Sequence, residues 1–154
     1  TDDLCVVSQN ENKRPIVLPD GRRLKLWKET IDKLDLATRH GEAVLKSFEK
    51  YYIEPFDTAN EPPILSAIFV LREADPSFLK GIEYLALPDA MRTLECEMYR
   101  TGLRARMGLK SELIAHAAAT IGHAKVFLLK RPRGFEHLGE TVALVRTHGD
   151  LLDT

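Results

Sequence analysis

Apolar residues gather along the chain in short blocks that predict a sheet. Residues 4–7, 64–71 and 125–129 are nearly continuous apolar runs, which are typical of strands covered on both faces. Shorter strands are expected at 15–18, which precede a Pro-Asp-Gly turn, and at 81–85, where apolar and polar residues alternate. We expect one mixed sheet that contains 4–7, 64–71 and 125–129.

Apolar residues at helical spacing predict helices that cover this sheet. In the first half, short helices are expected at 26–36 and 41–50. In the second half, the spacing predicts longer helices around 88–107, 111–122 and 136–152. The pattern of strands and helices therefore predicts an α/β (mixed α+β) fold.

Composition fits an ordinary globular chain. The 154 residues suit one domain, 1–154, and 44% of them are hydrophobic and 29% charged. The net charge is −1 and no apolar run approaches the roughly 20 residues that span a bilayer, so nucleic acid and membrane are not expected partners. Cys5 and Cys96 form no disulfide framework or metal motif, which favours a reduced cytoplasmic compartment.

The first residues raise the question of what precedes them. No initiator Met is present, and Asp2 and Asp3 lead directly into the apolar run at 4–7. Two interpretations stay open: a trimmed terminus with solvated acids, or a domain from which a strand and everything before it are missing. The second predicts exposed apolar surface near residues 1–8.

Asp2 and Asp3 are candidates for chemistry. Adjacent carboxylates on an extended chain point to opposite faces, and in phosphoryl transfer one acid can hold a metal ion while another accepts a hydroxyl proton. The alternative is that both acids are merely solvated. No phosphate loop, dinucleotide fingerprint, zinc motif or nucleophile elbow occurs in the sequence.

Positive charge is concentrated in the window 100–133, which contains eight Lys/Arg and one acid. Such a patch suits a phosphate, a nucleotide or an acidic peptide, although Arg100 could equally lie on the solvated side of a helical hairpin. Arg131 and Arg133 follow an apolar strand, at the strand end where α/β sites collect. Lys50 precedes two tyrosines and could pair with a phosphate or lie on the surface.

Several short motifs occur in a fixed order along essentially the whole chain: DDLCVV (2–7), LKLW (24–27), KYY (50–52), LECEMYR (94–100), MG (107–108), HAAA (116–119) and RPRGF (131–135). In this order and spacing the sequence resembles the carboxy-terminal kinase domain of HPr kinase/phosphorylase-like proteins. The resemblance is closest to the subgroup encoded beside peptide natural-product pathways, which includes lasso-peptide kinases.

The resemblance implies a phosphoenolpyruvate-carboxykinase-like fold and an ATP- and Mg²⁺-dependent kinase that transfers the γ-phosphate to a serine of a small protein or peptide. The family's phosphate loop and nearby histidine, which precede the acid pair, do not occur in this sequence. The family's Asn-x-Arg near residue 95 is not reproduced in register either. The resemblance implies catalytic roles for Asp2 and Asp3 and metal binding for Asp3, and it leaves Glu95 as a candidate metal ligand and Arg100 as a candidate contact. As cations, Lys50, Arg100, Arg131 and Arg133 are the candidates for nucleotide binding, if the fold brings them near the acid pair.

A second function class stays open beside the kinase. The chain could be a non-catalytic fragment or regulatory module that binds an acidic peptide or a phosphorylated ligand. A GxxxxGK[ST] motif encoded upstream of Thr1 would favour the kinase, whereas a start codon at this position would favour the module. A homo-oligomer is compatible with either reading.

Overall fold

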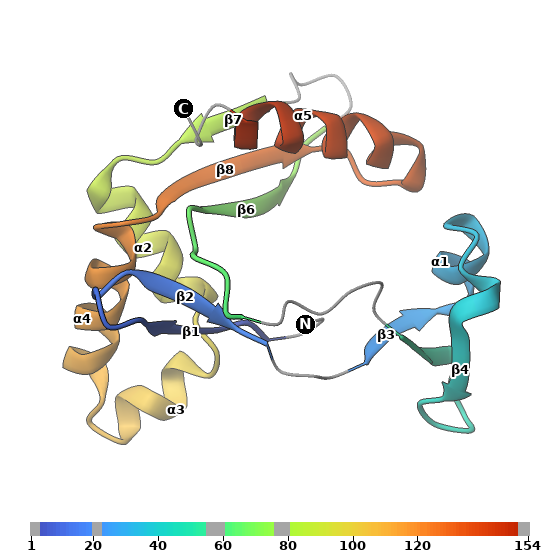
Figure 1. Cartoon of the computed structure of the whole chain (residues 1–154), viewed down its shortest axis with the longest axis horizontal. Helices are drawn as coiled ribbons and strands as arrows, with labels where there is room; N and C mark the ends of the chain where they lie inside the picture. Colours follow the sequence, from blue (N-terminus) through green and yellow to red (C-terminus); the bar gives the residue numbers. More distant parts are fainter. Residues whose placement is uncertain (1–3, 20–22, 55–60, 76–80, 151–154) are drawn as a thin grey trace. The chain divides into compact units, whose positions relative to one another are not determined.

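A computed structural model describes four segments of the chain: 4–19, 23–54, 61–75 and 81–150 (Figure 1). These segments form a mixed α/β structure whose strands lie in three small sheets, which confirms the expected class. The chain divides into two compact units: the first comprises 1–8 and 16–63, and the second 9–15 and 64–154. Each unit has its own three-stranded sheet.

The sheet of the second unit is built around strand β8 (Lys125–Arg131). Strand β6 (Ala67–Glu73) pairs with it in parallel and β7 (Gly81–Tyr84) pairs with it antiparallel, in the order β6-β8-β7. Val126, Phe127 and Leu129 are buried in the central strand. A continuous apolar run is what a strand with both faces covered requires, so the prediction at 125–129 is confirmed.

Helices α2 (Leu87–Glu97) and α4 (Lys110–Ile121) pack against each other, and α2 covers one face of this sheet. The hydrophobic core joins Ala90 and Leu94 of α2 to strand residues of β6 and β8, with Ile121 of α4 packed against the cluster. Helix α4 confirms the prediction at 111–122.

Aromatic side chains cross the opposite face of the sheet. Phe127 lies opposite both Phe69 and Tyr84 in the register, and its ring centroid is 5.2 Å and 5.8 Å from theirs. His148 of helix α5 (Leu138–Asp150) places its ring 4.9 Å from Phe127, so α5 lies along this face (Figure 1). The helix begins at Leu138 after a single 3₁₀ turn, η2 (Phe135–His137).

The single helix predicted around 88–107 is broken into two. Helix α2 ends at Glu97, and a new helix, α3 (Thr101–Arg106), starts after Arg100. Arg100 is in the left-handed region with φ 53°, which interrupts the right-handed helical backbone between α2 and α3. The break lies at residues 98–100, which include neither proline nor glycine. Neither the apolar spacing nor a turn residue therefore marks its position in the sequence.

The first unit contains a smaller antiparallel sheet in the order β3-β5-β4. Its strands are β3 (Leu24–Trp27), β4 (His40–Ala43) and β5 (Lys50–Ile53). Between β3 and β4 lie helix α1 (Lys28–Lys33) and the 3₁₀ turn η1 (Ala37–Arg39). Among the described residues of the first unit, the buried apolar ones are Ile31 and Ile53.

Both helices predicted for this unit are corrected. The helix expected at 26–36 is shorter, because Trp27 belongs to β3 and pairs with Lys50. The helix expected at 41–50 does not form: β4 and β5 make a hairpin there, in which the Val44 amide donates to the Lys50 carbonyl at 2.8 Å. Pairing with the tyrosine-rich β5 satisfies the backbone, whereas a ten-residue isolated helix is marginal in water.

The strand expected at 4–7 does not join the β6-β8-β7 sheet, so the prediction of one sheet that contains 4–7, 64–71 and 125–129 is wrong. Strand β1 (Val6–Gln9) instead pairs with β2 (Pro15–Leu18), as two strands joined by a short turn. Asn10 Oδ1 accepts the Arg14 amide at 2.9 Å within that turn. A local hairpin closes at a lower entropic cost than a distant pairing.

Candidate functional site

The residues predicted to carry chemistry fall in different places. Asp2 and Asp3 lie outside the described residues. Lys50 belongs to the first unit, on β5. The remaining four belong to the second unit: Glu95, Arg100, Arg131 and Arg133. Of these, Arg131 and Arg133 are brought together, at one end of β8.

The carboxyl end of β8 is built by the parallel pairing with β6. Because parallel strands end at the same edge, the segment leaving β6 runs beside the end of β8, and the Ala74 amide donates to the Arg131 carbonyl at 2.9 Å. Arg131 is half-buried, the next residue, Pro132, is fully buried, and Arg133 is exposed. Gly134 follows with φ 123°, a conformation that glycine adopts readily, and the chain then turns into α5.

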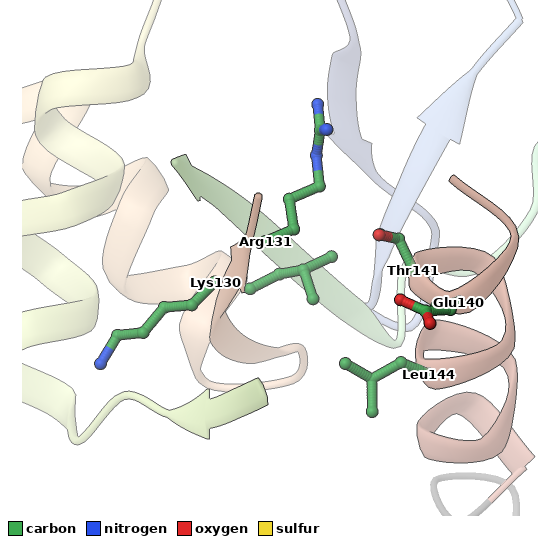
Figure 2. A pocket seen from close by; sticks show the side chains of 6 residues that line it. Lys130, Arg131, Glu140, Thr141 and Leu144 are labelled. Carbon is green, nitrogen blue, oxygen red and sulfur yellow. The ribbon is translucent and has the colours of Figure 1, made fainter. Parts of the chain in front are cut away.

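A hollow of ≈ 230 Å³ lies between the end of β8 and the first turns of α5 (Figure 2). Its apolar side chains are Leu129 and Leu144, and its polar ones include Glu140 and Thr141. Lys130 also lines the hollow, but its side chain is directed away from the α5 residues and its Nζ pairs with Glu83 at 2.8 Å (Figure 2).

Charge is unevenly distributed around this hollow. The Arg131 guanidinium extends away from Glu140 (Figure 2) and donates from Nη1 to the Pro132 carbonyl at 3.3 Å. It forms no ion pair with a residue that the structure describes. Glu140 lies 3.9 Å from His137 Nδ1, and the Thr141 hydroxyl donates to the His137 carbonyl at 2.8 Å. Arg131 therefore has no charged partner among the described residues, while Glu140 places a negative charge on the helix side of the hollow.

Arg100 and Glu95 are exposed. The Arg100 guanidinium carbon lies 5.0 Å from the centre of the Tyr99 ring. Within the described segments, no group of three or more His, Cys, Asp or Glu side chains is placed to hold a metal ion. The assignment of Glu95 as a metal ligand therefore stays a prediction.

Lys50 has an aromatic neighbour in the first unit. Its Nζ lies 5.8 Å from the centre of the Trp27 ring, a cation–π distance. Trp27 in turn contacts Phe48 edge to face at 6.4 Å. Nearby, Lys28 Nζ donates a hydrogen bond to the Asp32 carboxylate at 2.9 Å. This bond and the negative charge of Asp32 raise the pKa of Lys28. The assignment of Lys50 as a phosphate contact stays a prediction.

Sequence reasoning missed the α5 side of the hollow. Glu140, Thr141 and Leu144 are separated from Arg131 by a glycine turn and a 3₁₀ turn. The spacing of Thr141 and Leu144, i and i+3, marks one helix face and was the signal available. The contact between this helix face and the end of β8 depends on how the chain folds back after Gly134, and a local sequence pattern does not show that.

No family model, no curated protein and no solved structure matches this chain. Within the described part, no helix combines the length and apolar character that crossing a membrane requires.

Proposed function

We propose that this chain carries the part of an HPr kinase-like serine kinase that follows the phosphate loop. Mg²⁺-ATP would supply the phosphoryl group, and the acceptor would be a serine of a small protein or peptide. The order of sequence motifs motivates the proposal. The observation that carries it is the placement of Arg131 and Arg133 at the carboxyl edge of a parallel strand pair.

This edge has the chemistry that a phosphate needs. Ligands of open α/β sheets collect beyond the carboxyl ends of parallel strands. Arginine presents a planar fork of donors that matches phosphate oxygens, and Arg131 uses one nitrogen for the Pro132 carbonyl. Burial of Pro132 and the Ala74–Arg131 backbone bond hold the strand end in place, which limits the entropy lost when the arginines bind an anion.

Asp2 and Asp3 complete the proposal as the acid pair. One carboxylate would contact the metal ion and the other would accept the proton of the serine hydroxyl. These roles come from the resemblance, and the two residues lie outside the described segments.

The proposal is tested on the protein expressed from the complete reading frame that contains this chain. Calorimetric titration with Mg²⁺-ATP compares the natural protein with a variant that carries Arg131→Ala and Arg133→Ala. Charge-assisted hydrogen bonds contribute about 1.5–3 kcal/mol each, so affinity should fall by at least about tenfold. Lys125→Ala, at the opposite end of β8, is the matched control and should change affinity by less than about twofold.

A second measurement separates transfer from binding. Incorporation of label from γ-labelled ATP into serine should be lost in Asp3→Asn, while nucleotide affinity is retained within severalfold. Absence of nucleotide binding, or equal binding by the Arg131/Arg133 variant, would contradict the kinase. Binding of inorganic phosphate or a phosphopeptide at the same arginines without ATP would instead support the non-catalytic module.

A further inference from the structure

Helix α3 carries apolar side chains that the described residues do not cover. Leu103 is 50% exposed and Met107, which follows it by four residues, is 63% exposed. Residues spaced by four lie on the same side of a helix, so the two form one apolar stripe. Tyr99 and Ile114 are also exposed and flank the helix on the α2 and α4 sides. Apolar side chains this close in sequence and this exposed are typical of interaction surfaces.

Basic side chains border the stripe. At 100° per residue, Arg104 lies on one side of Leu103 and Arg106 on the other. Lys110 follows at the start of α4. None of these three side chains makes a hydrogen bond or ion pair with a residue that the structure describes, and the only acid close to them in sequence, Glu112, accepts from Ser111 at 3.1 Å.

Helix α4, which follows at once, shows what a partnered helix looks like. It buries Leu113, Ala117 and Thr120, whereas every α3 residue from Gly102 to Arg106 is exposed. Helix α3 is tied to the chain by backbone bonds, such as Leu109 amide to Arg104 carbonyl at 3.0 Å. Its side chains therefore contribute little to the core, and their apolar and basic character is available to a partner.

We propose that α3 docks an acidic amphipathic segment of a partner protein. The segment would place apolar side chains on Leu103 and Met107 and carboxylates against Arg104 and Arg106. Charge complementarity identifies this occupant, because positive charge lies on both sides of the apolar stripe. Methionine suits such a site, since its flexible side chain adapts to different partners.

An anionic membrane is the competing occupant, and the geometry disfavours it. A six-residue helix is only about 9 Å long. The left-handed Arg100 separates α3 from α2, and α3 and α4 run in different directions (Figure 1). A peptide can adapt its shape to apolar side chains that lie on segments at an angle to each other. A flat bilayer can contact only side chains that lie in one plane.

The test uses fluorescence anisotropy with a labelled peptide of about 16 residues, made of Glu and Leu with Leu at i, i+3 and i+7. One control peptide has the same composition in shuffled order, and another has Lys in place of Glu. Vesicles of phosphatidylglycerol and of phosphatidylcholine are titrated in parallel. The chain is assayed without nucleotide or phosphate, so the outcome is independent of the proposed kinase activity.

The amphipathic acidic peptide should bind saturably and at least about tenfold more tightly than either control peptide. Each of two variants, Leu103→Gln/Met107→Gln and Arg104→Glu/Arg106→Glu, should weaken binding about tenfold. The matched control on α5, Val142→Gln/Arg146→Glu, also removes an exposed apolar residue and an exposed arginine at i, i+4 and should bind normally. Equal binding of the shuffled peptide, an equal loss in the α5 control, or tight vesicle binding without peptide binding would each overturn the proposal.

Discussion

The two three-stranded sheets of this chain differ in how their central strands are covered. In the second unit, β8 buries Val126 toward α2 and Phe127 toward α5, so successive residues enter opposite cores. In the first unit, the central strand β5 buries Ile53 alone, and its other residues are half-exposed. Strand β4 beside it is exposed at all four positions.

The difference explains which parts of the fold a hydrophobic pattern can reveal. A strand covered on both faces has a nearly continuous apolar run, and this signal is hard to mistake when turn residues bound it. A strand in a thin sheet mixes lysine, tyrosine and isoleucine, and its pattern does not distinguish strand from helix. We expect the two sheets to differ in stability in the same way.

Removing the central aromatic ring of the second unit should have the largest effect. Phe127→Ala removes ring contacts with Phe69, Tyr84 and His148 and leaves a cavity beside α5, which should cost about 3–5 kcal/mol in free energy of unfolding. Far-UV circular dichroism in urea follows α2, α4 and α5 and should show an earlier transition. Leu71→Ala, at an exposed position of β6, is the control and should shift it little.

Ile53→Ala provides the matched test of the first unit. Ile53 is 1% exposed, and its truncation should cost about 2–4 kcal/mol within that unit. Trp27 is the sole tryptophan and lies on β3, so its fluorescence reports on this unit during unfolding. The fluorescence midpoint should fall more than the dichroism midpoint, and Phe127→Ala should show the reverse order. Identical shifts of both probes in both variants would argue that the units unfold as one.

The sequence predicted the second unit better than the first for physical reasons. The strands at 81–85 and 125–129 and the helix at 111–122 form as expected, because each has its own period and its own turn residues. The helix at 41–50 fails because β4 and β5 pair in a hairpin, and β5 pairs on its other side with the more distant β3. Such pairing depends on the partner strand and is invisible in a local window.

The candidate site was only partly predictable. Arg131 and Arg133 were identified because they follow a clear buried strand. The hollow beside them requires α5 to pack antiparallel along β8, which brings Glu140 and Leu144 to the strand end. Lys50 was a phosphate candidate because of its charge and its place in the KYY motif, and its neighbour Trp27 could be found only from the register of β3 with β5.

The break between α2 and α3 offers a smaller test, of backbone strain. Arg100 has φ 53°, which costs a non-glycine residue roughly 1–2 kcal/mol, part of which glycine recovers despite its greater freedom when unfolded. Arg100→Gly should therefore raise stability by about 0.5 kcal/mol, seen as a higher melting temperature. Arg92→Gly, inside α2, should lower stability by about 1 kcal/mol. A loss of stability in both variants would show that the side chain of Arg100 matters more than its backbone strain.

The smallest expected effects are changes in phosphate affinity on substitution of Glu140, in the second unit, and Lys50, in the first. At the end of β8, Glu140 and Arg131 both line the hollow, and the side chain of Glu140 is 63% exposed, so its charge is largely screened by water. In water, unit charges a few ångströms apart repel by at most about 1 kcal/mol, so Glu140→Gln should tighten phosphate binding about twofold. Lys50→Ala should leave phosphate affinity unchanged, because Lys50 contacts the Trp27 ring in the first unit. Phosphorus NMR titration of inorganic phosphate measures both; weaker binding in Glu140→Gln, or a loss in Lys50→Ala comparable with that in Arg131→Ala, would move the anion site away from β8.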